Sequence, residues 1–194
     1  MNYTMTARVF SIPVRLRSDG ARLTGLELGR EGVAFPELPG TRECPELALF
    51  DAVRRWLDDY AAGRRPDPGR LPLAPEGSPF ARTVWEILLT VPYGETLTYG
   101  EVARRAAARL GKTRMAAQAV GQAVGANPIA IVIPCHRVMG AHGRLTGYGG
   151  GLARKVALLK HEGAATEHLI WPQGKKWHPH RDSNPGCRDE NPVS

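Results

Sequence analysis

Cys135 and His136 stand side by side in the chain, and Glu162 lies further along. A cysteine reacts as its thiolate, and a neighbouring imidazole can remove the thiol proton. A carboxylate behind the imidazole holds the ring in the useful tautomer, as in other catalytic triads. The three residues therefore predict a nucleophilic cysteine with a base and an orienting acid. Two simpler interpretations stay open, because a lone cysteine is usually a small buried side chain and Cys–His neighbours also occur by chance.

The cysteine content argues against structural uses of the thiols. Cys44, Cys135 and Cys187 are too few and too scattered for a disulfide framework. No two of them have the C-x-x-C spacing of a structural zinc site. The sequence therefore predicts no metal site, and we expect no cofactor.

The net charge of +7 is concentrated in the middle of the chain. Residues 1–78 contain eleven Lys and Arg and eleven Asp and Glu, and residues 165–194 contain four of each sign. Residues 79–164 carry eleven Lys and Arg against four Glu. Such a block favours a polyanion as partner, with nucleic acid first among the candidates. A solvated basic face would produce the same asymmetry.

Composition and periodicity divide the chain into four segments. Residues 1–70 predict an N-terminal α/β domain, in which short apolar runs suggest strands and a helical pattern follows from residue 45 to 63. Residues 71–78 predict a linker, and residues 79–164 a C-terminal helical domain. Residues 165–194 lack periodicity, and we expect a disordered tail. The fold class is therefore α+β. The runs expected to form strands are Ala7–Leu16, Arg22–Leu28 and Gly32–Leu38.

The C-terminal domain has the outline of a winged helix. Ser78-Pro79 supplies an N-cap and a first-turn proline, and Thr98-Tyr99-Gly100-Glu101 fits a capping box. A turn that contains glycine joins two helices in the basic block, which suggests a helix-turn-helix. The expected elements are helices over 79–91, 98–110, 114–125 and 152–162, a buried strand over Ile129–Ile133, and a Gly-rich loop over Gly140–Gly151.

The residues around the cysteine resemble a known signature. Ile133-Pro134-Cys135-His136-Arg137-Val138 is similar to the active-site motif of the O6-alkylguanine-DNA alkyltransferases, also called methylated-DNA–protein-cysteine methyltransferases. The resemblance covers roughly residues 78–164, whereas residues 1–70 match in general layout only. Further motifs stand in the family's order: Pro92-Tyr93-Gly94-Glu95-Thr96, Thr98-Tyr99-Gly100-Glu101-Val102-Ala103, Ala119-Val120-Gly121, Asn127-Pro128, Thr146-Gly147-Tyr148-Gly149-Gly150-Gly151-Leu152 and Lys160-His161-Glu162-Gly163.

This resemblance implies the chemistry and its catalytic residues. The winged helix would enter the DNA minor groove and extrude the target base, because the O6 atom is otherwise out of a side chain's reach. Cys135 would accept the alkyl group, His136 would act as base through a water, and Glu162 would orient His136. Tyr99 would favour extrusion of the base and donate a proton to the guanine leaving group.

Other family positions imply contacts to the substrate. Asn127 would tie the recognition helix to the cysteine loop. Val138 would offer its backbone to the edge of the base, and Tyr148 would line the pocket beside the Gly149 backbone. Simpler roles are open for each, such as a packed tyrosine ring or a helix stop before Pro128.

The helix expected over 114–125 would carry the DNA contacts. Its small side chains would let its backbone approach a groove closely, although a helix packed inside the domain would look the same. Where the family commonly has an arginine finger to fill the space of the flipped base, this chain has Gln118. Gln118 can hydrogen-bond the orphaned base but lacks the charge, and Arg114, one turn earlier, could assist. The expected DNA-binding residues are Arg114, Ala116, Ala117, Gln118, Ala119 and Gly121.

Together these features predict a DNA-repair enzyme that is consumed by its reaction. It would move an alkyl group, chiefly methyl, irreversibly from O6 of guanine in double-stranded DNA, and also from O4 of thymine, to its own cysteine. We expect a monomer. We also expect the protein in the cytoplasm, since neither a secretory signal nor a membrane-spanning run is present.

Three other functions fit parts of the sequence. A non-enzymatic alkyltransferase-like protein would recognise the lesion but would replace the acceptor cysteine, which is present here. A winged-helix regulator would need no Pro-Cys-His-Arg. If the protein were a Cys–His hydrolase, neither the basic block nor the small-residue helix would have a function.

Overall fold

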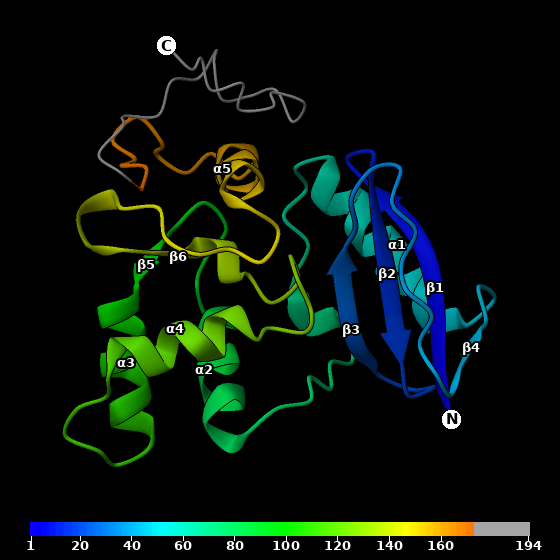
Figure 1. The fold of residues 1–194 in the computed structure, drawn as a ribbon, viewed down its shortest axis with the longest axis horizontal. Coiled ribbons are helices and arrows are strands. Elements are labelled where there is room, and N and C mark those ends of the chain that lie inside the picture. The colour runs from blue at the N-terminus through cyan, green and yellow to red at the C-terminus, as the bar shows by residue number, and fades with distance from the viewer. Residues whose placement is uncertain (173–194) are drawn as a thin grey trace, which may run out of the picture.

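The computed structural model describes residues 1–172, which form a sheet with one long helix and, beside it, a group of helices (Figure 1). This is the α+β arrangement expected from the sequence. The strands are β1 (Asn2–Val9), β2 (Ile12–Ser18), β3 (Leu23–Leu28), β4 (Thr41–Glu43), β5 (Leu97–Thr98) and β6 (Val138–Met139). The helices are α1 (Ala48–Ala61), η1 (Pro68–Arg70), α2 (Pro79–Leu89), α3 (Tyr99–Arg109), α4 (Ala117–Gly125), η2 (Cys135–Arg137), η3 (Ala141–Gly143) and α5 (Leu152–His161).

The N-terminal sheet has the strand order β3-β2-β1-β4, and α1 packs against β1. The β1–β2 and β2–β3 pairs are antiparallel, whereas β4 runs parallel to β1. The expected run Ala7–Leu16 is in fact two strands, because Phe10 and Ser11 both take positive φ values and turn the chain between them. The expected run Gly32–Leu38 forms no strand beyond a single bridge between Arg30 and Val33.

Helices α2 and α3 begin where their capping residues predict. The Ser78 hydroxyl accepts a hydrogen bond from the Ala81 amide at the start of α2. At the start of α3, Thr98 Oγ1 accepts from the Glu101 amide, and the Glu101 carboxylate accepts from the Thr98 amide, which completes the predicted capping box. Side-chain caps of this kind satisfy backbone N–H groups that the helix itself leaves unpaired.

Helix α4 is shorter than the sequence suggested. It starts at Ala117, and Ala116 is its N-cap with extended φ and ψ angles. Arg114 therefore lies in the loop before the helix rather than one turn earlier on its surface. No side chain caps this N-terminus, which removes the local signal that would have marked the true start.

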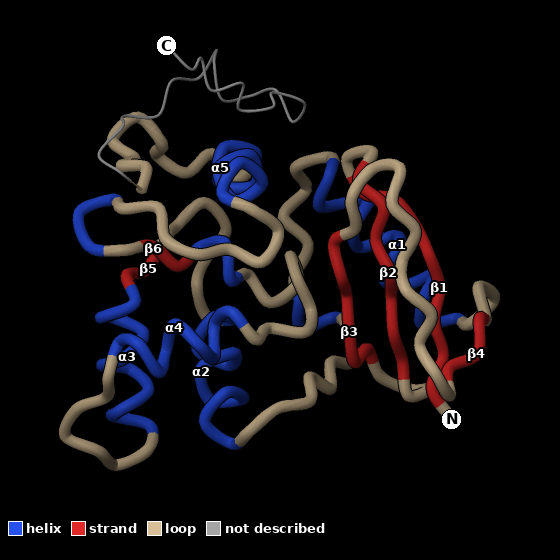
Figure 2. The backbone as a smooth tube through the Cα atoms, in the orientation of Figure 1, coloured by secondary structure: helices blue, strands red, loops and turns tan. Residues whose placement is uncertain are grey.

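The apolar run Ile129–Ile133 is not a strand. Between α4 and η2 the chain is loop (Figure 2), with a single parallel bridge from Ile129 to Leu26. Ile131 takes φ 68°, which is unusual and strained for a β-branched residue. All residues from 131 to 139 are buried. The β-branched side chains are therefore explained by the burial of a tight loop, and they do not indicate a strand.

The first residues of the expected tail are folded against the Gly-rich loop. Ile170 bridges to Arg144, and the Leu145 amide donates to the Ile170 carbonyl. Leu169 packs in a small cluster of buried side chains with Leu145 and residues of α5. Residues 165–172 are thus ordered, contrary to the expected disorder, and the rest of the expected tail lies outside the described residues.

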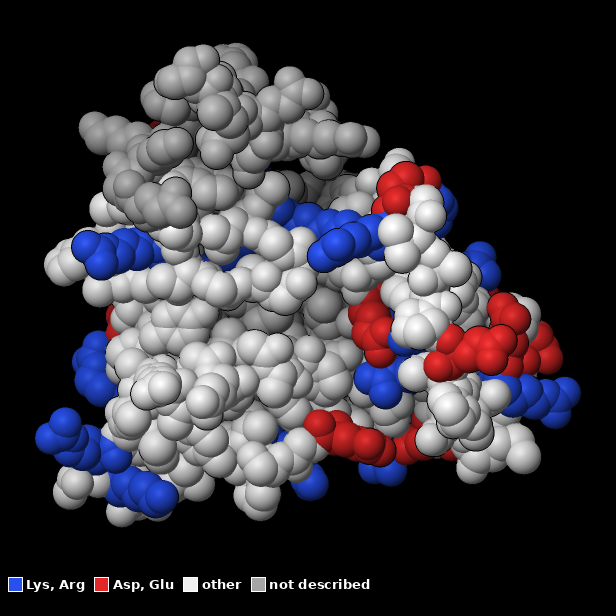
Figure 3. Space-filling view, viewed as in Figure 1, with Lys and Arg blue, Asp and Glu red and all other residues white. Residues whose placement is uncertain are grey.

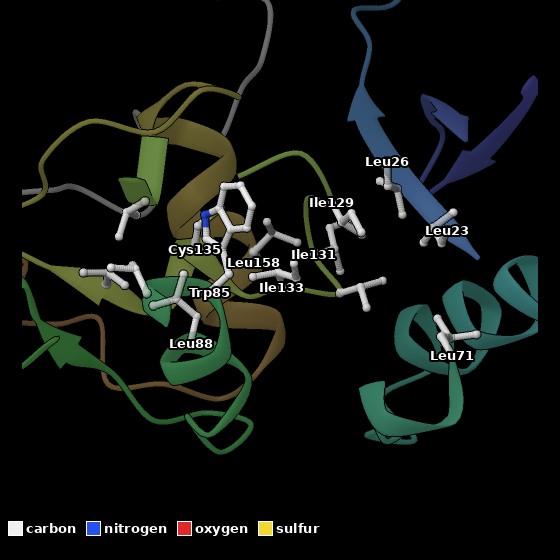
Figure 4. Close-up of a cluster of buried hydrophobic side chains, with 14 of the residues drawn as sticks. Leu23, Leu26, Leu71, Trp85, Leu88, Ile129, Ile131, Ile133, Cys135 and Leu158 are labelled. Atoms are coloured by element: carbon white, nitrogen blue, oxygen red, sulfur yellow. The ribbon is translucent and has the colours of Figure 1, made fainter. Parts of the chain in front are cut away.

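The two parts of the fold share one hydrophobic core. Leu26 of the sheet, Ile129 of the cysteine loop and Trp85 of α2 belong to the same cluster of buried side chains (Figure 4). Backbone hydrogen bonds support the junction, because the Leu26 amide donates to Pro128 and the Ala130 amide donates to Leu26. The loop that carries Cys135 is therefore clamped between sheet and helices.

The folded segment after α5 gives the first prediction. Leu169→Ala should lower the free energy of unfolding by about 2–5 kcal/mol, as is usual for a leucine in a packed site, because Leu169 is only 4% exposed. Urea unfolding followed by circular dichroism measures this. Glu167→Ala, on the exposed side of the same segment, is the control. Equal stability of both variants would show that the segment does not contribute to the fold.

Candidate active site

Cys135 is the first residue of η2 and is 9% exposed. Its sulfur accepts a hydrogen bond from Asn127 Nδ2 at 3.1 Å. The same amide group donates to the Ile133 carbonyl at 2.8 Å, and Asn127 Oδ1 accepts from the Ile129 amide at 3.0 Å. Asn127 therefore links the end of α4 to the cysteine loop.

His136 and Glu162 meet directly in the interior. His136 Nε2 lies 2.8 Å from Glu162 Oε1, and both side chains are fully buried. An ionised carboxylate can only accept hydrogen bonds, so Nε2 must carry the proton of a neutral ring. Nδ1 then has the free electron pair, and among residues 1–172 it has no hydrogen-bond partner. The pair thus presents a base at Nδ1, one residue from the thiol.

Glu162 is also held by groups from distant parts of the chain. The Arg137 guanidinium binds both carboxylate oxygens, with Nε at 2.7 Å from Oε2 and Nη2 at 2.9 Å from Oε1. The Tyr60 hydroxyl donates to Oε1 at 2.7 Å, and the Gly94 amide donates to Oε2 at 3.3 Å. This set of donors compensates for the burial of the charge.

Glycine is required at position 94. Its φ is 81°, and a Cβ atom there would lie 2.7 Å from the Glu162 carbonyl oxygen. The Pro92-Tyr93-Gly94 turn thereby lets a backbone amide reach the carboxylate. A motif that the sequence analysis noted only for its resemblance is part of the site.

The surroundings set the protonation states of the three groups. Burial opposes the charge of Glu162, but the hydrogen bonds from His136 and Arg137 outweigh it and hold the pKa of Glu162 below its ordinary value. Burial lowers the pKa of His136, although Glu162 acts in the opposite direction. Burial also raises the pKa of the Cys135 thiol, against the effects of Asn127 and Lys155. The resting site therefore holds a thiol beside a neutral imidazole, and the proton has still to be moved.

Lys155 of α5 is a charged group of the site that the sequence did not reveal. Its side chain is fully buried and donates to the carbonyl oxygens of Val138 and Thr146. Burial lowers the pKa of Lys155 to about 8, while Cys135 acts to raise it. A cation in this position favours the thiolate form of the cysteine.

The other expected pocket residues gather around Cys135. Tyr99 is the first residue of α3, and its ring lies close to Gly121 of α4. Burial raises the pKa of Tyr99, which interacts with the Thr146 side chain and with Cys135. The hydroxyl of Tyr148 is buried without a hydrogen-bond partner within residues 1–172.

Val138 and Gly149 differ in accessibility. Val138 is fully buried in β6, which pairs with β5 and so joins the cysteine loop to the start of α3. Its carbonyl oxygen accepts from Lys155 and keeps a second lone pair. Gly149 is exposed in the Gly-rich loop.

Sequence reasoning missed Tyr60, Arg137 and Lys155 as members of the site. Arg137 stood inside the recognised hexapeptide, and the Arg next to a Cys–His pair was the available signal. Tyr60 looked like one more apolar position of a helical stripe. Lys155 counted as part of the basic surface, although both Lys155 and Arg137 point their charges inward.

The small-residue face of α4 is at the surface. Gln118 is exposed, and the face it belongs to shows little charge in Figure 3, with basic groups toward its edges and acidic groups mainly over the sheet. The expected DNA-binding residues Ala116, Ala117 and Arg114 are exposed, and Ala119 and Gly121 are partly buried. The exposed cations of α3 and of the segment before α4 are Arg104, Arg105, Arg109, Lys112 and Arg114, and Arg109 forms an ion pair with Glu86.

In residues 1–172, no cluster of three or more His, Cys, Asp or Glu side chains could hold a metal ion. None of the described helices is long and apolar enough to cross a membrane.

Comparison with known proteins identifies close relatives. Residues 79–164 match the family described as 6-O-methylguanine DNA methyltransferase, DNA binding domain. The chain is 43% identical over 150 residues to the methylated-DNA–protein-cysteine methyltransferase of Mycobacterium tuberculosis, covering 77% of this chain and 86% of that one. The corresponding Haemophilus influenzae protein is 41% identical over 145 residues, with 75% and 77% covered.

Solved structures agree with these matches. The crystal structure of Mycobacterium tuberculosis O6-methylguanine methyltransferase superposes with a TM-score of 0.69 at 41% identity, covering 84% of this chain and 93% of that one. Mycobacterium tuberculosis OGT in complex with DNA gives a TM-score of 0.67 at 40% identity, with 83% and 91% covered.

The buried carboxylate predicts a specific acid sensitivity. The pKa of Glu162 is lowered on folding, so the ionised carboxylate makes its full contribution to the free energy of unfolding above its ordinary pKa of 4.5. That contribution is lost as the pH falls toward the pKa of Glu162 in the folded protein. The stability gap between the wild type and Glu162→Gln should therefore narrow below pH 4.5. Urea unfolding at a series of pH values tests this, with Glu86→Gln, an exposed carboxylate, as control. A gap that stays constant down to pH 3 would contradict the argument.

Proposed function

This chain belongs to the family of the methylated-DNA–protein-cysteine methyltransferases, and from that premise we propose that it repairs DNA by moving an alkyl group from O6 of guanine to Cys135. Direct-reversal repair of DNA by alkyl transfer is the activity of the family. The observation that carries the assignment of the acceptor is the His136–Glu162 hydrogen bond, which leaves His136 Nδ1 as a base one residue from Cys135. The presence of that cysteine argues against the non-enzymatic, lesion-binding alternative.

The proposed reaction is a single displacement at the alkyl carbon. His136 Nδ1 takes the thiol proton, through a water, and the Cys135 sulfur attacks the methyl carbon. The sulfur–carbon bond forms as the carbon–O6 bond breaks, and the electron pair passes to the guanine. Tyr99 donates a proton to the leaving base, which is restored as ordinary guanine.

The neighbouring residues support the activation of Cys135 and the placement of the base. Burial keeps His136 neutral and so able to accept a proton, and Lys155 and Asn127 favour the thiolate as it forms. Asn127 holds the sulfur against the end of α4. Two groups are proposed contacts for the base, with the Gly149 backbone nearby. They are the Tyr148 hydroxyl, which has no hydrogen-bond partner within residues 1–172, and the second lone pair of the Val138 carbonyl.

The proposed partner is double-stranded DNA that carries the lesion. The uncharged face of α4 would enter the minor groove, with Gln118 in the space left by the flipped base, and Arg114 in the preceding loop would contact phosphate. We further propose that the protein acts as a monomer in the cytoplasm and that O4-alkylthymine is also repaired. Residues 1–70 would form a supporting domain that shares its core with the alkyltransferase domain of residues 79–164. None of these steps requires a cofactor.

Transfer should be stoichiometric. A thioether has no good leaving group, so each chain should accept at most one alkyl group. Incubation with duplex DNA that contains O6-methylguanine, followed by intact-mass and peptide analysis, should show a gain of one methyl on Cys135. Cys135→Ser should lose transfer but keep DNA binding, and that binding should weaken as salt rises, because phosphate contacts release counterions. Sustained turnover beyond one equivalent would refute the mechanism.

Gln118 offers a separate test of base extrusion. Its amide would satisfy the orphaned pyrimidine with one neutral hydrogen bond, worth about 0.5–1.5 kcal/mol, whereas bonds to charged groups contribute roughly 1.5–3 kcal/mol. Gln118→Arg should therefore speed repair of duplex DNA, and Gln118→Ala should slow it. Reaction with free O6-benzylguanine should change little in either variant, because nothing has to be extruded. Parallel changes on both substrates would mean that Gln118 shapes the pocket instead.

A further inference from the structure

The active site receives one hydroxyl from the N-terminal part of the chain. Tyr60, in the last turn of α1, donates a hydrogen bond to Glu162 Oε1 at 2.7 Å across 102 positions of sequence. The ring is 1% exposed. Oε1 is the same oxygen that faces His136 Nε2 at 2.8 Å, so Tyr60 and His136 share one acceptor atom.

The position of the Tyr60 ring is fixed by its neighbours. It stacks on Trp56 with ring centres 5.7 Å apart and an angle of 7° between the planes. Phe10, at the turn between β1 and β2, and Tyr93 contact it edge to face. The Tyr60 carbonyl oxygen also lies 2.7 Å from Nε2 of His161, the residue before Glu162. The Tyr60 hydroxyl and the Tyr60 carbonyl oxygen therefore contact two consecutive residues at the end of α5, Glu162 and His161.

The direction of the hydrogen bond follows from the charges. Burial and the adjacent Glu162 carboxylate raise the pKa of Tyr60, so the hydroxyl keeps its proton and acts as a donor. Each donor on a carboxylate oxygen withdraws charge from it. A carboxylate that is relieved in this way attracts the proton on a neighbouring imidazole less strongly.

We propose that Tyr60 is a positioning residue of the active site, which holds Glu162 Oε1 against His136 and limits how strongly that carboxylate stabilises the protonated imidazole. The inference rests on the proposed function, in which His136 must be neutral to take the proton of Cys135. The N-terminal part of the chain would then help to determine the pH at which the enzyme reacts, in addition to its structural role.

Several other charged or titratable groups act on the same pair. Arg137 lies on both oxygens of Glu162, and Lys155 disfavours protonation of His136 from the side of α5. These groups remain in place when the Tyr60 hydroxyl is removed, so the change isolates one donor. The groups that face Glu162 or His136 are Tyr60 from α1, Tyr93 and the Gly94 amide from the turn after α2, Arg137 from η2, Tyr148 from the Gly-rich loop, and Lys155 from α5.

The test removes the hydroxyl and keeps the ring. In Tyr60→Phe, Glu162 Oε1 loses the Tyr60 donor and keeps His136 and Arg137 Nη2. The imidazolium is then favoured, and the acid limb of the pH–rate profile should move up by about one pH unit, the scale of a single hydrogen bond. The rate of transfer from duplex O6-methylguanine DNA is measured between pH 5 and 9. The His136 titration is followed in parallel by NMR of the histidine-labelled protein.

Phe10→Leu is the matched control. The Phe10 ring contacts the Tyr60 ring edge to face in the same aromatic cluster, and its side chain has no group that could bind the carboxylate. This variant should leave both the pH profile and the His136 titration unchanged, and thermal unfolding of both variants reports any loss of packing.

The outcomes separate the inference from the function. An upward shift in Tyr60→Phe alone supports the inference. An unshifted profile and titration in Tyr60→Phe, or equal shifts in both variants, would overturn it and leave Tyr60 a packing residue. If the wild type transfers no alkyl group, the proposed function fails, while the NMR titration still decides whether Tyr60 acts on His136.

Discussion

The site depends on keeping one carboxylate ionised where water does not reach. Glu162 is 3% exposed and accepts hydrogen bonds from an arginine, a histidine, a tyrosine and a backbone amide. A buried charge with fewer partners would take up a proton instead. Three constraints follow: a glycine in the turn after α2, an arginine directly after His136, and the end of α1 packed against the end of α5. Without the negative charge of Glu162, the His136 ring would no longer be held with its proton on Nε2.

Much of this arrangement could be predicted from local sequence. The α+β class, the caps of α2 and α3, and the stop of α1 rest on interactions within a few residues, which the local pattern records. The Cys135–His136 pair and the distant Glu162 were identified because the chemistry requires those residue types. The resemblance of the surrounding motifs added Tyr99, Asn127, Val138 and Tyr148, whose roles remain proposals.

The failures share a physical origin in contacts between distant segments. Tyr60 reads as an apolar helix position, and only the packing of α1 against α5 reveals its hydroxyl as a donor. The Ile129–Ile133 run has the composition of a strand, but its backbone turns to satisfy Leu26 of the sheet. Residues 165–172 form no helix or strand of their own, so their sequence has no periodicity. They lie against the Gly-rich loop through one β-bridge, between Ile170 and Arg144. No local pattern could supply these partners.

The wide sequence separation of the Tyr60–Glu162 contact also determines at which stage of folding the site forms. Contacts between residues far apart in sequence require the ordering of a long stretch of chain, so they form late and slow the folding of proteins that depend on them. The strand contact of Leu26 with the cysteine loop spans a comparable distance. A chain still emerging from the ribosome would possess Cys135 before it possesses the network around it. Under the proposed mechanism the thiol is used once, and late assembly would then keep it from reacting until the whole protein has folded.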